Sequence, residues 1–285
     1  MTELDPRTSA FRSDLADARL KGRVAADRFV AGTPRRVVAP SAPLRCARTA
    51  DAPLDSELLR GEIFTVFETT PDGLAWGQLE TDGYVGHVPV SALSATLTPT
   101  PTHRVSALRA FVFREPDMRT PPLFALSFGA QVAVDGAAET RGIHYSRLAD
   151  GEGWMGAVTL APVGARSAED YVTVAERFLN VPYLWGGRTS LGLDCSALVQ
   201  HALAAMGKSA PRDSDLQEKL LGQPLVGGVA QAKRGDLLFW PGHVAICRDA
   251  ESIVHASGTF MAVVVEPLSE ALPRMGPPRS VSRPL

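Results

Sequence analysis

The chain has 285 residues, and at roughly 100 to 200 residues per domain this length favours two or three domains over one. Its 29 Lys and Arg residues nearly balance 31 Asp and Glu residues, and a net charge of −2 provides no basic field that would attract nucleic acid. Hydrophobic residues make up 45% of the chain, which is enough to build a core. Apolar runs such as residues 261–265 are far shorter than the roughly 18 residues that cross a membrane. We therefore expect a folded protein with no membrane span and no nucleic-acid partner.

Cysteine is scarce and its number is odd, because the chain contains only Cys46, Cys195 and Cys247. Three cysteines spread through the chain do not make a disulfide framework, and no close pair of Cys or His has the spacing of a structural zinc site. The first residues lack both the basic start and the apolar stretch of a cleaved signal peptide. We therefore expect a cytoplasmic protein with at least one free thiol.

Residues 1–40 carry charges of both signs and are interpreted as an N-terminal extension that packs on the rest of the protein. Residues 13–20 are the helix candidate in this segment, because Leu15, Ala16 and Leu20 would form an apolar stripe. A partner-binding arm is the alternative interpretation. No residue pattern in this segment indicates chemistry.

Residues 41–163 show short alternating segments separated by turn signals, which is typical of small β domains. An internal repeat divides the region. Trp76 begins Trp-Gly-Gln-Leu, followed by Asp-Gly-Tyr-Val-Gly-His-Val, and Tyr145 begins Tyr-Ser-Arg-Leu, followed by Gly-Trp-Met-Gly-Ala-Val. An aromatic residue followed by glycine between strands suits a tightly bent barrel, and these residues resemble bacterial SH3-like domains. We predict two SH3-like β-barrels, at residues 41–98 and 99–163.

The sequence pattern changes after Gly164. Ser167 followed by Asp170 marks the start of a helix, which Asn180 ends. A further helix is expected near residues 196–206, with strands at residues 236–240, 243–247 and 252–256. Helices followed by strands indicate an α+β domain over residues 164–285.

Cys195 opens the second of these helices, directly after a glycine-rich loop. Unpaired backbone N–H groups and the helix dipole at such a position favour the thiolate, which is the nucleophilic form of cysteine. A buried inert cysteine is the usual alternative for a free thiol. The interpretation therefore depends on whether a base is available to Cys195.

Histidine has a suitable pKa for the base that takes the thiol proton and returns it to the leaving group. His243 begins one predicted strand and His255 lies in the next, so adjacent strands would bring the two imidazoles together as base and orienting residue. His201 lies more than a turn into the helix that Cys195 opens, and we interpret it as a packing residue. Metal binding by His243, His255 and Cys195 is the alternative, although no acidic residue or second cysteine completes such a site.

Three motifs in this order resemble the NlpC-type family of papain-like cysteine peptidases, which cut bacterial cell-wall peptides. They are Asp-Cys-Ser at 194–196, Arg-Gly-Asp-Leu-Leu-Phe-Trp before His-Val-Ala-Ile at 234–246, and His-Ala-Ser at 255–257. The resemblance implies a papain-like α+β catalytic domain with Cys195 as nucleophile, His243 as general base and acid, and His255 orienting His243. It implies no metal and no cofactor. We interpret Arg-Gly-Asp at 234–236 as a structural turn.

Family members with N-terminal SH3-like domains include dipeptidyl peptidases that recycle murein tripeptides. They hold a free L-Ala amine and cut after γ-D-Glu, before a diamino acid. This resemblance implies seven substrate-binding residues, which are Asp194, Tyr183, Ser196, Asp213, Ser214, Glu62 and Tyr84. Asp194 and Tyr183 would hold the ammonium group, because a cationic amine needs a fixed anion in a closed pocket. Glu62 and Tyr84 match by position the residues with which the first barrel closes the site.

We therefore predict a cysteine peptidase of murein peptides. It would hydrolyse the bond between γ-D-glutamate and diaminopimelate or Lys in peptides with a free N-terminal L-Ala, in cell-wall peptide recycling. One alternative is a murein endopeptidase that acts on intact wall. Another is a murein-binding protein whose papain-like domain is inactive or transfers acyl groups. The sequence gives no indication of the oligomeric state.

Overall fold

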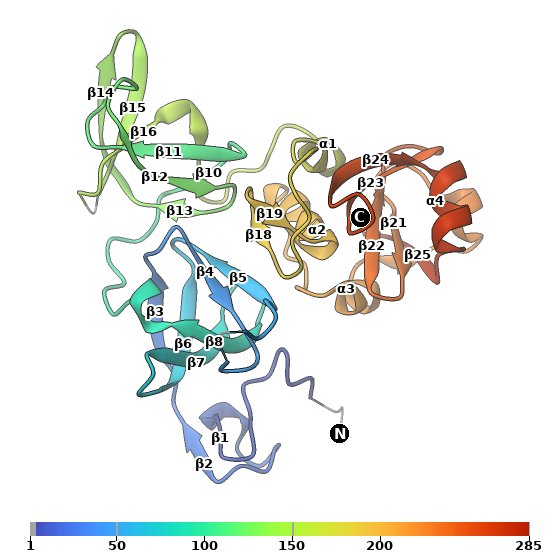
Figure 1. The fold of residues 1–285 in the computed structure, drawn as a ribbon, viewed down its shortest axis with the longest axis horizontal. Coiled ribbons are helices and arrows are strands. Elements are labelled where there is room, and N and C mark those ends of the chain that lie inside the picture. The colour runs from blue at the N-terminus through green and yellow to red at the C-terminus, as the bar shows by residue number, and fades with distance from the viewer. Residues whose placement is uncertain (1–3, 50, 150, 285) are drawn as a thin grey trace. The chain divides into compact units, whose positions relative to one another are not determined.

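The chain folds into two units, residues 1–163 and residues 164–285, and the boundary coincides with the change of sequence pattern after Gly164 (Figure 1). The structure is a computed structural model that describes residues 4–49, 51–149 and 151–284. Within those ranges the first unit is built from strands and short 3-10 helices, and the α-helices belong to the second unit. No helix in the described ranges is long and apolar enough to cross a membrane.

The first barrel contains a five-stranded antiparallel sheet in the order β8-β7-β6-β3-β9, and β4 and β5 form a separate hairpin. Its elements are β3 (Thr33–Val37), β4 (Ser41–Leu44), β5 (Ser56–Leu59), β6 (Ile63–Thr69), β7 (Leu74–Leu79), β8 (Val85–Pro89), the 3-10 helix η2 (Val90–Ala92) and β9 (Leu93–Ser94). Leu44, Leu58 and Phe64 are fully buried at its centre. Gly77 follows the repeat's first aromatic residue, and a Cβ there would lie 2.3 Å from the carbonyl oxygen of Thr65. The first copy therefore needs glycine at this position, where two strands approach closely, whereas the second copy has Ser146 there.

The residues before this barrel pack on it, but the helix expected at residues 13–20 is wrong. The segment instead forms β1 (Leu15–Asp17), the 3-10 helix η1 (Ala18–Leu20) and β2 (Arg28–Val30), with β1 and β2 paired in parallel. Leu15 packs with Phe67 and Trp76 of the barrel, and this tertiary burial outweighs the weak helical spacing. Arg12 lies over the ring of Trp76, 4.3 Å from its centroid. The barrel's sheet also includes β3, which lies within residues 1–40.

The second barrel repeats the pattern of the first. Its elements are β10 (His103–Val105), β11 (Arg109–Phe113), β12 (Pro122–Ser127), β13 (Gln131–Val132), β14 (Val134–Thr140), β15 (Ile143–Leu148), β16 (Trp154–Gly156), the 3-10 helix η3 (Ala157–Thr159) and β17 (Leu160–Pro162). Three consecutive antiparallel strands, β14, β15 and β16, precede η3, as β6, β7 and β8 precede η2. The sequence repeat therefore corresponds to a repeated three-stranded unit that ends in a 3-10 turn.

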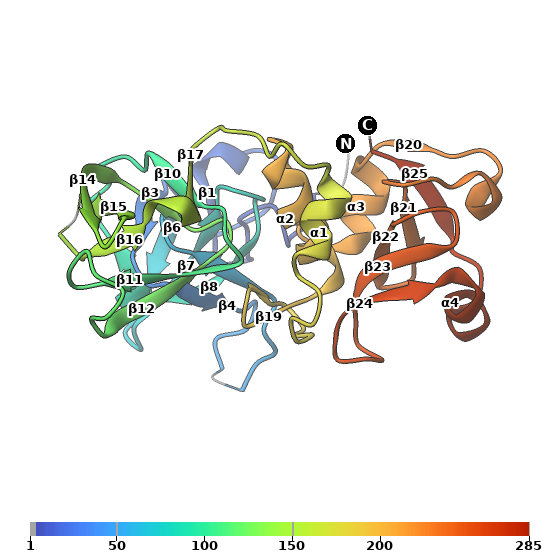
Figure 2. The ribbon, with the colours of Figure 1, turned by 90° about the horizontal axis from the view of Figure 1, so that it is seen from above.

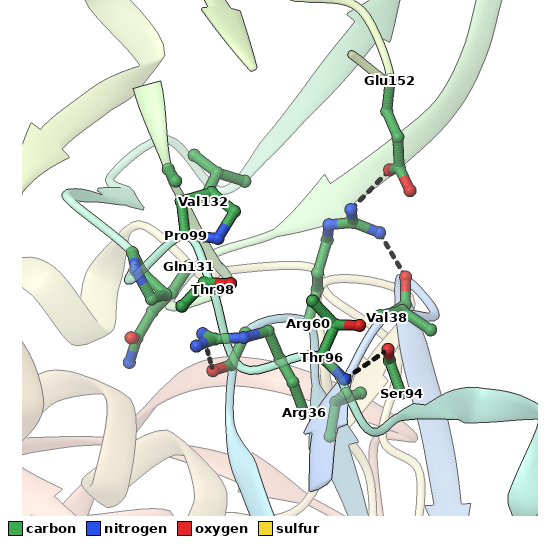
Figure 3. Close-up of a pocket in the computed structure, with 14 residues that line it drawn as sticks. Arg36, Val38, Arg60, Ser94, Thr96, Thr98, Pro99, Gln131, Val132 and Glu152 are labelled. Atoms are coloured by element: carbon green, nitrogen blue, oxygen red, sulfur yellow. Dashed lines mark hydrogen bonds and ion pairs between the residues drawn. The ribbon is translucent and has the colours of Figure 1, made fainter. Parts of the chain in front are cut away.

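Arg60 joins the two barrels within the first unit (Figure 3). Its carbonyl oxygen accepts from the Gln131 N–H at 2.8 Å, and its guanidinium pairs with Glu152 and donates to the Val38 carbonyl. Beside it lies a cavity of about 170 Å³, at whose edge Arg36 donates to the Leu97 carbonyl oxygen. None of the substrate-binding or catalytic candidates lines this cavity.

The second unit is an α+β domain around a six-stranded sheet in the order β20-β25-β21-β22-β23-β24. Its elements are α1 (Tyr171–Glu176), β18 (Arg188–Thr189), β19 (Gly192–Leu193), α2 (Cys195–Ala205), α3 (Ser214–Leu220), β20 (Gln223–Pro224), the 3-10 helix η4 (Gly228–Gln231), β21 (Leu237–Trp240), β22 (His243–Cys247), β23 (Ser252–Ser257), β24 (Ala262–Pro267), α4 (Leu268–Met275) and β25 (Ser280–Arg283). The helices α1, α2 and α3 lie on one side of the sheet and α4 on the other (Figure 2). The two helices and three strands expected from the sequence are present, but α1 ends at Glu176 and residues 177–180 form turns, so the expected end at Asn180 is wrong.

Candidate active site

Helix α2 begins at Cys195 because Asp194 caps it. Asp194 has extended backbone angles, and its carboxylate accepts a hydrogen bond from the Ala197 N–H at 2.9 Å. Aspartate is among the preferred residues at this position, since it satisfies an N–H group that has no partner within the helix. Cys195 is therefore the first residue of the helix, as expected, and it is only 6% exposed.

Asp194 also forms a buried ion pair with Arg212, which sequence reasoning did not anticipate. The two guanidinium nitrogens lie 2.9 and 2.6 Å from the two carboxylate oxygens, and Arg212 is 1% exposed. The Gly186 N–H and the Ser196 hydroxyl donate to the same carboxylate. A buried charge of this kind needs a paired counter-charge. The negative charge that Asp194 would offer to a substrate ammonium is therefore already balanced, and its role in amine binding stays a prediction.

His243 and His255 lie together, as the strand pattern predicted. Strand β22 begins at His243 and pairs antiparallel with β23, which carries His255. His243 Nε2 lies 2.8 Å from His255 Nδ1, a hydrogen-bond distance, and the rings meet edge to face. In the described ranges, no three His, Cys, Asp or Glu side chains are grouped as metal ligands would be.

The thiol of Cys195 lies against the start of β22. The backbone N–H of Val244, the residue after His243, faces the thiol and favours its anionic form. Burial acts in the opposite direction and, with the nearby Asp194 carboxylate, raises the pKa of Cys195 to about 12. The backbone N–H groups at the helix terminus favour the thiolate, as expected, but they do not make it the favoured form at rest. The cost of burying an anion exceeds the effect of the backbone N–H groups.

Both histidines are held neutral. Burial lowers the pKa of His243 to about 3, with further contributions from His255, when that ring is protonated, and from Arg274. Burial and Arg274 lower the pKa of His255 to about 4. The resting site therefore holds a neutral thiol beside neutral imidazoles. A thiolate would form here only if the thiol proton passed to a neighbouring base.

Five of the seven proposed substrate-binding residues lie in the same unit as Cys195, and two of them, Asp194 and Ser196, are described above. Tyr183 is half-buried near Cys195 and Asp194, and its pKa is raised to about 12, chiefly by burial. Asp213 is the residue before α3 and Ser214 is the first residue of that helix. Arg212 thus links this segment to Asp194. No local pattern reveals the pair, because Arg212 and Asp194 lie 18 positions apart in the sequence.

The two candidates from the first barrel are buried in it. Glu62 is 5% exposed, and its carboxylate accepts from the Leu59 N–H at 2.7 Å. Tyr84 belongs to the hydrophobic core of the barrel. Their roles in substrate binding stay predictions.

The residues interpreted as structural have structural contacts. His201 Nε2 lies 2.8 Å from the Arg188 carbonyl oxygen, and its ring stacks on Phe178. Arg234 pairs with Asp170, the residue that caps α1. Both contacts join elements of the domain to one another.

Two sequence families match this chain. Residues 180–275 match the family described as NlpC/P60, and residues 44–93 match the family described as the bacterial dipeptidyl-peptidase SH3 domain. The first match contains the Cys-His-His group, and the second lies within the first barrel.

Curated relatives and a solved structure extend these matches. The chain is 29% identical to dipeptidyl-peptidase 6 of Lysinibacillus sphaericus over 192 residues, covering 64% of this chain and 70% of that protein. It is 33% identical to γ-D-glutamyl-L-lysine dipeptidyl-peptidase of Bacillus subtilis over 115 residues, which span 37% of this chain and 38% of that protein. The crystal structure of an NlpC/P60 family protein from Bacillus cereus shares the fold, with a TM-score of 0.73 at 19% identity over 88% of this chain and 99% of that chain.

Proposed function

Because the chain belongs to the NlpC/P60 family of cysteine peptidases, we propose that it is a dipeptidyl-peptidase that hydrolyses the γ-D-glutamyl to L-diamino acid bond. The names of the two curated relatives support the dipeptidyl-peptidase activity, and one of them names γ-D-glutamyl-L-lysine. The observation that carries the proposal is the hydrogen-bonded pair of His243 and His255, together with the N–H of Val244, the next residue, facing the thiol of Cys195 at a helix N-terminus. We extend the proposal to murein peptides with a free N-terminal L-Ala, and to a role in recycling within the cytoplasm.

The chemistry follows from these groups. Cys195 would transfer its thiol proton to His243 as the sulfur attacks the γ-carbonyl carbon, and the Cys195 backbone N–H would be among the donors to the oxyanion. His243 would then give the proton to the departing amine, which leaves a thioester. Water, deprotonated by His243, would release the dipeptide acid and restore the thiol. A raised thiol pKa suits this order, since the proton leaves only when attack begins.

The choice of substrate end depends on the amine site. We propose that Asp194, Tyr183 and Ser196 surround the L-Ala ammonium, with Asp213 and Ser214 on the adjoining side. The test compares a free L-Ala-γ-D-Glu-diamino acid peptide with its N-acetyl form. Loss of most turnover on acetylation supports the dipeptidyl-peptidase.

A murein endopeptidase is the second candidate, and one observation favours it. Arg212 balances the charge of Asp194, so the site offers less attraction to an ammonium than a lone carboxylate would. Equal turnover of acetylated and free peptides would identify the endopeptidase. Adding a second amine as acceptor would separate hydrolysis from acyl transfer, because only a transferase would form a new amide.

A further inference from the structure

A buried carboxylate lies next to His255, and the mechanism above does not use it. Glu266 in β24 is 3% exposed, and its Oε2 lies 3.0 Å from His255 Nε2. This is an ion-pair distance, although the angles fall outside those of a hydrogen bond. His255 Nε2 is buried and has no hydrogen-bond partner among the described residues, so the carboxylate is the acceptor available to it.

Arg274 holds this carboxylate in place. Its guanidinium lies 2.5 Å from Glu266 Oε2, donates to the Thr259 hydroxyl at 3.1 Å and covers the ring of Phe260. A carboxylate buried without a counter-charge would be strongly destabilising. Arg274 comes from α4, so the helix on the far side of the sheet fixes the position of Glu266.

The three groups leave one consistent arrangement of protons. A neutral imidazole has one N–H donor and one acceptor nitrogen, while a carboxylate only accepts. Facing Glu266, the Nε2 of His255 carries the proton, so its Nδ1 accepts. His243 Nε2 at 2.8 Å must then be the donor, and the Nδ1 of His243 has no proton.

We propose that Glu266 is a positioning residue that sets the tautomers of His255 and His243, and thereby leaves Nδ1 of His243 able to accept the thiol proton of Cys195. During attack, one proton passes from the sulfur to His243 Nδ1. The Nε2 proton of His243 stays shared with His255, and Glu266 remains a carboxylate. The proton then leaves with the product amine. The effect of Glu266 on proton transfer rests on the proposed function, whereas the tautomers of the two histidines do not.

Removing the charge of Glu266 and removing that of Arg274 should shift the pKa of His243 in opposite directions. The titratable and charged groups that face His243 are His255, Glu266, Asp194 and Arg274. Glu266 and Asp194 favour the imidazolium, and Arg274 opposes it. Removing the Glu266 charge therefore lowers the pKa of His243, and removing the Arg274 charge raises it.

The first test needs no activity. Nitrogen-15 NMR of the full chain labelled at histidine distinguishes the two neutral tautomers. We expect His255 with its proton on Nε2 and His243 with its proton also on Nε2. His255 protonated on Nδ1 in the unaltered protein would overturn the inference, whether or not the protein cleaves peptides.

The second test uses variants. We expect Glu266→Gln to reduce kcat by about 10- to 100-fold with little change in KM, as for residues that orient a functional histidine without contacting the substrate. The acid limb of the kcat/KM profile should move to lower pH in Glu266→Gln and to higher pH in Arg274→Met. Glu270→Gln is the matched control, because it removes an exposed carboxylate of α4.

A purely structural role would give another pattern. Glu266→Gln and Arg274→Met would then lower the thermal midpoint together and leave both pH limbs in place, which would refute the inference. Glu266→Asp should restore part of the activity if the carboxylate matters. If even the unaltered protein does not cleave the peptide, the proposed function fails. The NMR measurement of the tautomers would still decide the role of Glu266.

Discussion

Strand β22 begins at His243 beside one buried cysteine and ends at Cys247, the other. Burial raises the pKa of both thiols to about 12. Around Cys195, the backbone N–H groups of Val244 and Ser196 oppose this shift. Around Cys247, the carboxylates of Asp236 and Asp249 reinforce it, and the residue packs in the hydrophobic core. Burial is therefore common to both ends of the strand, and the donors and histidines nearby distinguish a nucleophile from a packing residue.

The largest difference should appear when each cysteine is replaced. We expect Cys195→Ala to reduce peptide hydrolysis by at least about a thousandfold, because no other group forms the thioester. Cys247→Ala should keep activity within about twofold and cost roughly 1 kcal/mol of unfolding free energy, since it leaves a small cavity. Steady-state hydrolysis and denaturant unfolding measure the two effects. Full activity in Cys195→Ala would refute the assignment.

The histidine at the start of β22 gives the next largest effect. His243→Ala should lower kcat by at least about a hundredfold, because it removes the general base and acid. His144→Ala is the control, since His144 is exposed in the second barrel. Equal losses in both variants would show that the substitution acts on folding and not on chemistry.

Alkylation tests whether Cys195 is a thiol at rest. Since the pKa of Cys195 is raised to about 12, its iodoacetamide reaction should rise about tenfold per pH unit between pH 7 and 9. Exposed Cys46 should react first at pH 7. Peptide mass spectrometry separates the sites. A Cys195 rate that is constant below pH 7 would indicate a thiolate and imidazolium pair instead.

The last prediction concerns stability in acid. Burial lowers the pKa of His201, His243 and His255 below their ordinary value of 6.5. The unfolded chain therefore binds more protons below pH 6.5, and the unfolding free energy falls as the pH drops toward 4. The loss at pH 5 is at most about 2 kcal/mol for each histidine. Urea unfolding at pH 7 and pH 5 measures it, and equal midpoints would contradict the burial of neutral histidines.

The sequence predicted the features that depend on local pattern. Asp170 before an apolar helix, the glycines of the barrel repeat and the strand position of His243 each have a short-range signature. His243 and His255 are 12 residues apart, with one turn between their antiparallel strands. The prediction that the two imidazoles meet therefore followed from the strand assignment.

Features that depend on distant residues were missed. Arg212 reaches Asp194 across 18 positions, and only the folded chain brings them together. Glu266 had one weak signal, a carboxylate inside the apolar strand β24. The helix prediction for residues 13–20 was wrong for the same reason. Leu15 is buried by residues of the barrel that are distant in sequence, and the helical spacing does not report this contact. The pKa of Cys195 depended on burial that no local pattern reports.

The proposed activity requires that this site cuts one particular bond. Mass spectrometry of L-Ala-γ-D-Glu-diaminopimelate after incubation with the protein tests it directly. We expect two products, the dipeptide L-Ala-γ-D-Glu and free diaminopimelate, and neither product with Cys195→Ala. Release of free L-Ala, or an intact peptide with unaltered protein, would contradict it.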